Sequence, residues 1–458
     1  MIRLLRYFVT GLFAWPFGDG FPFGSDRLRG TCRWEDERVI VWCRLRLLIG
    51  LCCLVPTLSG CSDRFLAGPM YYVENDALTK EVKGKNSLAG KPKLQDKVRN
   101  ALAKLYGEKP DRIIVPEGMG VLLTGGGARL ASFQKVGESK LRNLGPDRKP
   151  IAGGYGLYRR NCLHCHGVSG AGDGPTAAYL YPIPRDYRKG LFKFTSTPFG
   201  ARPHRDDLKR TITNGLHGTS MPAFEALMSS DEIEQVIDYV IFLSVRGETE
   251  LELIELGAIS DETDMSALSM DDARQAAESV FNKWKTAQTA MINPPVPAPP
   301  STPKSIHHGR DLFLGRTKEK LDCVGCHGAL AQGDGPTFVS QDVFNKVVFG
   351  GNPSEKEERL KQFDEKTREV WTQKLDDWGN PVRPANLSRG VYKGGRRPID
   401  LYWRISKGIN GANMPPGPND AAVIWDVVNF VLALPYQPEL LKDAPAPPAA
   451  EAPAVANR

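Results

Sequence analysis

The sequence predicts a mainly α-helical protein in which two tandem helical domains, joined by a helix and a Pro-rich linker, follow a poorly defined N-terminal region. Two segments of the chain repeat each other, the first beginning at Cys162 and the second at Cys323. Each copy closes with a run of apolar residues at helical spacing, and further helical patterns cover residues 94–106 and 271–289. These observations predict helices and little strand.

The composition is that of a globular chain. Of its 458 residues, 41% are hydrophobic and 25% are charged, which excludes wholesale disorder. The mean hydropathy of −0.32 excludes a polytopic membrane protein. The formal net charge is +7. Because this charge is mild and dispersed, no nucleic-acid partner is expected.

The first 61 residues have the features of a leader. Two arginines precede an apolar run of 14 residues, 47–60, which is shorter than the roughly 20 residues that span a bilayer. The run ends in Leu-Ser-Gly-Cys61, which resembles the cleavage box of bacterial lipoproteins. That resemblance implies a lipid on Cys61 and a protein anchored at the periplasmic face of the cytoplasmic membrane. A buried segment of an ordinary domain and a signal within residues 1–15 stay open as alternatives.

The repeat defines the organisation of the remaining chain. Three matched pairs of segments lie at offsets of 161, 200 and 193 residues, so the second copy contains an insertion at about 340–383. Within it, the apolar spacing over residues 354–378 predicts one helix with an apolar face. The predicted divisions are a leader (1–61), an N-terminal region of unknown role (62–148), the first domain (149–247), a linker (248–305), the second domain (306–437) and a disordered Ala/Pro tail (438–458).

The ends of the expected helices carry their own signals. Ser230 is expected to cap a helix over residues 231–243, which has acidic residues in its first turn. Asp420 is expected to open a helix over residues 421–434. In the linker, the expected helix is followed by a stiff polyproline-type spacer over residues 293–303.

Each copy contains the motif Cys-x-x-Cys-His, followed at the same distance by Gly-Asp-Gly-Pro-Thr. Two thiols three residues apart on one helical turn can reach the same ligand edge. In c-type attachment they add to the two vinyl groups of haem, and the adjacent His binds the iron. The sequence therefore predicts two covalently bound haem c groups, held by Cys162, Cys165, Cys323 and Cys326, with His166 and His327 as iron ligands.

Two other interpretations of the cysteine pairs stay open. Four cysteines from two pairs could bind one zinc ion, although this leaves the two following histidines without a role. A thioredoxin-like dithiol needs a βαβ setting, which the sequence does not show.

Around both motifs the chain resembles the class I cytochrome c family, over about residues 149–247 and 306–437. In that family a Gly and an aromatic residue precede the Cys pair on the first helix, and an aromatic residue of the last helix packs near that Gly. The matching residues are Gly154, Tyr158 and Tyr239 in the first copy and Gly309, Phe313 and Phe430 in the second. The resemblance implies two class I cytochrome c-like haem domains.

The resemblance also implies further ligands. A Met before Pro is the expected sixth ligand, and Met221 and Met414 occupy that position. Thioether sulfur favours ferrous iron and raises the potential. Pro175 and Pro336 match the Pro of short bacterial members whose carbonyl accepts the imidazole N–H, a bond that fixes the tautomer and orients the ring.

The other candidate ligands have simpler interpretations. Met228 is expected in the core, while His217 stays open as a replacement ligand for Met221. The remaining histidines are expected at the surface or in loops, namely His164, His204, His307 and His308.

These features predict a membrane-anchored electron carrier of a respiratory chain rather than an enzyme with catalytic residues. Its expected partners are redox proteins, in particular a membrane-bound oxidase or another respiratory complex. The alternative is a dihaem enzyme, such as a peroxidase or a sulfur-compound dehydrogenase, which needs an open iron position or an unusual ligand. The apolar face of the insertion is expected to pack onto its own domain, and a role in covering the haem of the second copy or meeting a partner stays open.

Overall fold

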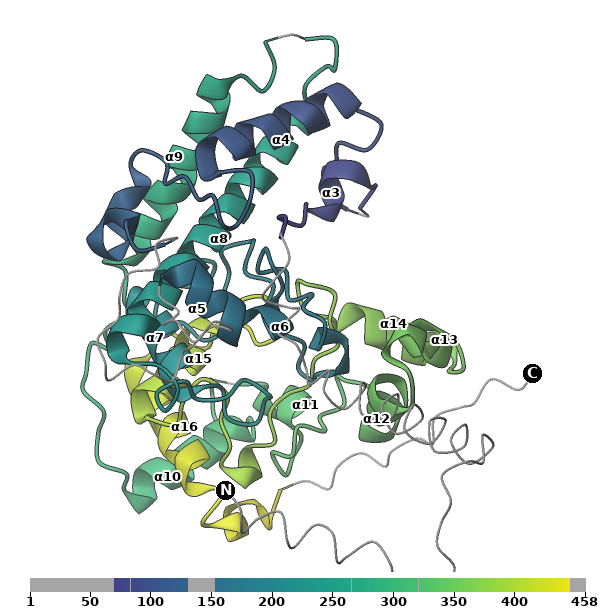
Figure 1. The fold of residues 1–458 in the computed structure, drawn as a ribbon. Helices are drawn as coiled ribbons and strands as arrows, with labels where there is room; N and C mark the ends of the chain where they lie inside the picture. The colour runs from purple at the N-terminus through teal and green to yellow at the C-terminus, as the bar shows by residue number, and fades with distance from the viewer. Residues whose placement is uncertain (1–69, 83, 131–152, 265, 320, 445–458) are drawn as a thin grey trace, which may run out of the picture. The chain divides into compact units, whose positions relative to one another are not determined.

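The computed structural model describes residues 70–82, 84–130, 153–264, 266–319 and 321–444. The predicted leader with Cys61 and the end of the predicted tail lie outside these residues. The described chain belongs to one compact unit. It contains helices and turns and, apart from one isolated bridge between Leu375 and Pro381, no strand (Figure 1). The predicted mainly α fold is confirmed, and none of the described helices is long and apolar enough to cross a membrane.

The two copies of the repeat contain corresponding helices in the same order. The first copy consists of α5 (Gly154–Asn161), α6 (Leu163–His166), α7 (Arg205–Asn214) and α8 (Ser230–Ala258). The second consists of α10 (Pro303–Phe313), α11 (Cys323–His327), α15 (Pro398–Lys407) and α16 (Ala421–Ala433). In each copy the first helix packs on the last, α5 on α8 and α10 on α16.

A glycine lets these helix pairs approach closely. An added Cβ on Gly154 would lie 2.8 Å from the Cβ of Tyr239, and one on Gly309 would lie 2.9 Å from the Cβ of Phe430. Real Cβ atoms do not approach other atoms so closely, because packed interiors leave no spare volume at such crossings. The glycines expected from the resemblance therefore lie at the two helix crossings.

Helix α8 differs from its prediction at both ends. Its N-cap is Ser229 rather than Ser230, because the Ser229 hydroxyl accepts the backbone N–H of Glu232 and the Glu232 side chain accepts that of Ser229. The helix continues to Ala258, well beyond the expected end at residue 243. It therefore crosses the predicted domain boundary at residue 247.

The sequence pattern does not predict the added turns of α8, because their polar residues are typical of a solvent-exposed segment. In the structure Glu248 is 3% exposed. It accepts a hydrogen bond from the indole N–H of Trp284 at 2.7 Å and forms an ion pair with Arg202. Charged residues can be buried when they are paired in this way.

The N-terminal region completes the core of the first copy. Helices α4 (Pro92–Tyr106) and α9 (Met270–Ala287) both pack on α8, and α3 (Asp76–Thr79) contributes to the same core. The Tyr106 hydroxyl bonds to Thr249 at 2.7 Å. The predicted N-terminal region and the predicted linker helix thus share one apolar core with the first copy.

The described chain also contains short 3-10 turns. These are η1 (Met119–Leu122), η2 (Thr124–Gly127), η4 (Ala177–Tyr179), η5 (Pro353–Glu355), η6 (Leu387–Arg389) and η7 (Pro438–Leu441).

The prediction of a single helix over residues 354–378 is wrong. The insertion contains α12 (Gln341–Phe349), α13 (Lys356–Leu360) and α14 (Glu365–Gln373). Asp364 accepts the backbone N–H of Thr367 and so starts α14 as a separate helix. The apolar residues at helical spacing instead form a small local core, with Phe344, Phe363 and Trp371 as its largest members.

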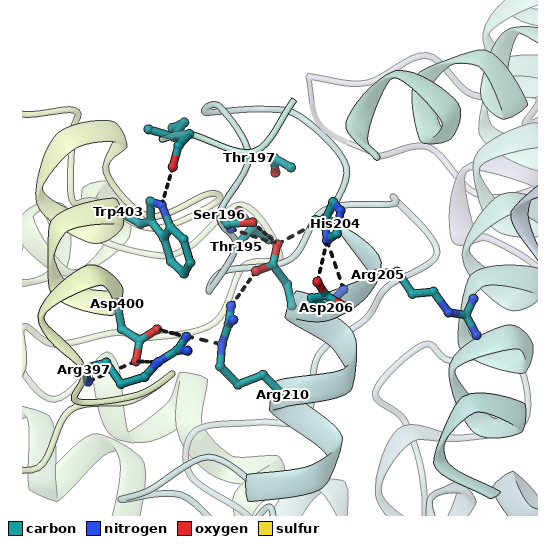
Figure 2. Close-up of polar contacts among 12 residues, drawn as sticks. Thr195, Ser196, Thr197, His204, Arg205, Asp206, Arg210, Arg397, Asp400 and Trp403 are labelled. Atoms are coloured by element: carbon teal, nitrogen blue, oxygen red, sulfur yellow. Dashed lines mark hydrogen bonds and ion pairs between the residues drawn. The ribbon is translucent and has the colours of Figure 1, made fainter. Parts of the chain in front are cut away.

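Charged and polar residues join the two copies (Figure 2). Arg210 of α7 pairs with Asp207 at 2.5 Å and lies 3.9 Å from Asp400 of α15. The Lys407 ammonium donates a hydrogen bond to the Thr195 hydroxyl at 2.8 Å. Both carboxylates are almost fully buried. Each buried charge at this junction therefore has a partner, as its desolvation requires.

The residue before the Pro-rich spacer contacts both copies. The backbone N–H of Ile292 donates to Ser196 at 2.8 Å, and its carbonyl accepts the indole N–H of Trp403 at 2.8 Å. Further along, the carbonyl of Val296 accepts the indole N–H of Trp425 at 3.1 Å. The spacer is thus fixed to the domains at this end.

Candidate functional site

Each Cys-x-x-Cys-His motif forms a single helical turn, α6 in the first copy and α11 in the second. The four cysteines are free thiols and partly exposed. Cys162 packs against the core of the first copy and Cys323 against that of the second. Burial raises the pKa of both thiols to about 12. In each turn the first thiol therefore borders the apolar interior, on the same helical turn as the second.

The Gly-Asp-Gly-Pro-Thr segment wraps around the turn that precedes it. Three of its backbone N–H groups donate to carbonyls of the motif in each copy. In the first copy these bonds run from Gly172, Gly174 and Thr176 to His166, Cys165 and His164, at 3.0, 3.2 and 3.1 Å. In the second they run from Gly333, Gly335 and Thr337 to His327, Cys326 and Gly325, at 2.8, 3.1 and 3.1 Å. The Gly-Asp-Gly-Pro-Thr segment therefore holds the Cys turn in place by backbone hydrogen bonds. This explains why the motif and the segment are repeated together.

Backbone carbonyls orient both motif imidazoles. The Nδ1 of His166 lies 3.2 Å from the carbonyl oxygen of Arg185, and the Nδ1 of His327 lies 3.1 Å from that of Ala385. A carbonyl only accepts, so Nδ1 carries the proton in each ring. The Nε2 lone pair is then available to a metal.

Pro175 and Pro336 do not supply these carbonyls, so that prediction is wrong. Both prolines are exposed, in the segment wrapped around the Cys turn. The carbonyls come instead from the residues that follow Pro184 and Pro384. These two prolines begin the matched pair of segments at offset 200, which is the signal in the sequence that could have identified Arg185 and Ala385.

Burial keeps both imidazoles in the neutral form. It lowers the pKa of His166 to about 4, and it also lowers the pKa of His327. Neutral imidazole is the form that binds a metal. The two side chains therefore have the proton state and the free nitrogen that an iron ligand needs.

Aromatic residues of the core lie around the first imidazole. The Tyr187 ring centroid is 5.3 Å from that of His166. The Tyr187 hydroxyl donates to that of Tyr158 at 2.6 Å, which in turn donates to the carbonyl of Gly167 at 2.8 Å. The Tyr158 and Tyr239 rings are 5.0 Å apart. Hydrogen bonds thus connect Tyr158, at the crossing of α5 and α8, to Gly167, the residue that follows the motif.

The second copy uses phenylalanine at the same place. The Phe313 ring centroid is 6.4 Å from that of His327 and 5.3 Å from that of Phe430. The aromatic pairing expected from the resemblance is therefore present in both copies, without the hydroxyl chain in the second.

Met221 and Met414 lie in equivalent loops after α7 and α15. The carbonyl of Met221 accepts the N–H of Leu216 at 3.1 Å, and that of Met414 accepts the N–H of Ile409 at 3.0 Å. Met221 is half-buried and packs against the core of the first copy. The two loops thus close in the same way, which places the two methionines at matching positions.

The other methionine and histidine candidates lie in the core, at the surface or at a helix end, as expected for residues that bind no iron. Met228 is 1% exposed and belongs to the core, whereas His217 is exposed. His204 caps α7, because its side chain accepts the N–H of Asp206. His164, His307 and His308 are exposed as well.

The four-cysteine zinc site is not formed. Among the residues that the structure describes, no three His, Cys, Asp or Glu side chains gather as a metal site. The two Cys pairs border separate cores.

The helices, the Cys turn and the oriented neutral imidazole define a c-type cytochrome domain in the first copy, a class that holds haem covalently and transfers electrons. More particularly, residues 149–240 match the family described as cytochrome c oxidase, cbb3-type, subunit III. A chain of a reducing HAO-like protein complex of Kuenenia stuttgartiensis is similar at 22% identity and a TM-score of 0.41, covering 64% of this chain and 97% of that one. No curated protein matches the chain.

Proposed function

We propose that the chain is a dihaem c-type cytochrome that transfers electrons in a respiratory chain, to or within a terminal oxidase complex. A lipid on Cys61 would hold it at the periplasmic face of the cytoplasmic membrane. The observation that carries the proposal is the equivalence of the two Cys turns, each with its imidazole held by a backbone carbonyl. The match of residues 149–240 to an oxidase subunit family supports the respiratory setting.

The residues present fit haem in both copies. Bound haem supplies an iron that changes its charge by one electron. The chain would hold it by two thiols for attachment, a neutral imidazole with a free Nε2 and the thioether of a methionine. Two protein ligands leave no open position for a substrate, which favours a carrier over an enzyme. The proposed iron ligands are His166 with Met221 and His327 with Met414.

Direct contact between the copies supports electron exchange from one haem to the other. The Asn410 side chain accepts the backbone N–H of Gly200 at 2.9 Å and donates to the carbonyl of Phe192 at 3.0 Å. Asn410 lies in the loop that carries Met414. The two sites therefore belong to domains that are in contact, and are not joined by a tether alone.

We expect two covalent haems per chain after expression with a cytochrome maturation system. A pyridine haemochrome assay after extraction with acid acetone measures this number. Replacing Cys323 and Cys326 together by alanine should remove half of the retained haem, because thioether bonds are then impossible in the second copy. The matched double replacement of Cys162 and Cys165 should do the same. Wild-type protein with one haem, or with zinc in its place, would contradict the proposal.

We expect Cys61→Ala to abolish lipid attachment. The thioether-linked diacylglyceryl group needs the cysteine sulfur, and more than one acyl chain is needed for stable membrane binding. The variant should run as a larger precursor and incorporate no labelled palmitate, with Cys53→Ala as the control in the same leader. Equal labelling of Cys61→Ala and wild type would show that the anchor lies elsewhere or is absent.

A further inference from the structure

A short segment of the insertion, residues 375–380, contacts the first copy. The Trp378 ring covers the guanidinium of Arg185, whose central carbon lies 3.7 Å from the ring centroid. The indole N–H of Trp378 also donates to the carbonyl of Asp186 at 2.7 Å. One tryptophan of the second domain thus holds both the side chain of residue 185 and the backbone of its neighbour.

A buried carboxylate strengthens this contact. Asp376 is 7% exposed, and its Oδ2 lies 2.9 Å from the Lys193 ammonium and 3.7 Å from the Arg185 guanidinium. Its Oδ1 accepts the backbone N–H groups of Trp378 and Asn380 at 3.1 and 2.8 Å. A carboxylate with partners on both oxygens has a fixed position. Asp376 therefore fixes Arg185 from the side of the second domain.

Arg185 is also the residue that orients the first imidazole. Its carbonyl accepts the Nδ1–H of His166 at 3.2 Å. Such a bond sets the orientation of the ring and raises the basicity of the metal-binding nitrogen. Because Trp378 and Asp376 hold the side chain of Arg185, they limit how far this carbonyl can move.

The second copy offers an internal comparison. Ala385 occupies the position of Arg185, and its carbonyl accepts the Nδ1–H of His327 at 3.1 Å. Alanine has no charged side chain for another domain to hold. The arrangement is therefore particular to the first site.

The same segment also contacts the loop that carries Met414. The backbone N–H of Asp377 donates to the carbonyl of Gly411 at 3.1 Å. An added Cβ on Gly411 would lie 2.1 Å from the Trp378 ring, and the φ of this residue is +63°. Only glycine adopts this backbone readily and leaves room for the ring. Trp378 therefore lies between the loop of the first imidazole and the methionine loop of the second site.

We infer that Asp376 and Trp378 are positioning residues for His166, so that the electronic state of the first haem depends on the second domain. The inference rests on the proposed haem sites. It gives the insertion a role inside the chain, between the two proposed redox centres, rather than a contact with an external partner.

Two conservative variants test the inference. Asp376→Asn removes the charge that pairs with Arg185 and Lys193, and Trp378→Phe removes the indole N–H. In both we expect the midpoint potential of the first haem to rise, because a weaker bond at Nδ1 makes the imidazole a poorer donor to ferric iron. The potential of the second haem should not change. Spectroelectrochemical titration measures both, and the signal that Met414→Ala retains identifies the first haem.

The matched controls lie in the same insertion. Asp364→Asn keeps a good N-cap for α14, and Trp371→Phe changes the local core without touching Arg185. Both should leave the two potentials unchanged. Hydrogen exchange of the backbone amides of residues 185–190 gives a readout that does not depend on haem, and it should speed up in the two test variants only.

The outcomes separate this inference from the proposed function. A first motif without covalent haem contradicts the proposed function, whereas the exchange result still tests the contact. If haem is bound at both motifs, and neither test variant changes the potential of the first haem or the exchange of residues 185–190, the positioning role is wrong. An equal shift of both haems would also overturn it, because the effect would then be a general loss of packing.

Discussion

Replacement of Met414 by alanine is expected to change the ligation of one haem and leave the other intact. Alanine has no sulfur, so in the proposed ligation the sixth position of the second iron would open to water. The weak sulfur-to-iron band in the near infrared should fall by half in the oxidised protein. The potential of that haem should fall, because thioether ligation favours the ferrous form. Optical and electron paramagnetic resonance spectra of the oxidised variant measure the change in spin state.

Two further variants control this experiment. Met221→Ala should produce the corresponding change at the first haem, while Met228→Ala removes a core methionine and should keep both bands. If Met414→Ala kept the near-infrared bands of both haems, a residue other than Met414 would bind the second iron. High-spin iron or peroxide turnover in the wild-type protein would favour the enzyme alternative. If Met221→Ala leaves its band unchanged, the first iron has a sulfur ligand other than Met221.

The parts of the site that depend on neighbouring residues could be predicted from the sequence. The Cys turn follows from a short motif, the two glycine crossings follow from the resemblance to class I cytochromes c, and Asp420 caps α16 as expected. The carbonyl partners of the imidazoles could not be assigned in this way. Arg185 lies 19 residues beyond His166, and Ala385 lies 58 beyond His327. Only the backbone enters these bonds, so residue type at the accepting position carries no signal, and only the repeat of the segments that begin at Pro184 and Pro384 points to them.

Contacts between distant segments were harder still. The bond from Trp378 to Asp186 spans 192 residues, and the apolar spacing around Trp378 favoured a single surface helix. The local pattern ends α8 too early for the opposite reason, because Glu248 has the character of a surface residue, whereas in the structure Trp284 and Arg202 are its partners. In both cases contacts between distant segments determine the secondary structure, although the local sequence pattern favours a different one.

Gly309→Ala is expected to destabilise the second domain, although alanine is the better helix former. Gly309 lies within α10, where the exchange alone would stabilise the helix by about 1 kcal/mol. The new Cβ, however, would lie 1.9 Å from the carbonyl oxygen of Asp426 and 2.9 Å from the Cβ of Phe430. Helices α10 and α16 must then separate. Overpacking a well-packed core costs about 1–3 kcal/mol, and a backbone carbonyl cannot rotate away, so the loss should exceed the gain.

Urea unfolding followed by far-ultraviolet circular dichroism measures this effect, with the Soret band reporting the haem environment. Gly120→Ala is the matched control, because its Cβ would be 3.5 Å from the nearest atom, an ordinary contact. Gly154→Ala tests the same crossing in the first copy, where the Cβ would lie 2.5 Å from the carbonyl oxygen of Gln235. We expect both crossing variants to unfold at lower urea concentration and the control to stay near wild type. If Gly309→Ala were as stable as wild type, α10 and α16 would not meet as closely as described, and the glycine crossing would be lost as one of the features that the two copies share.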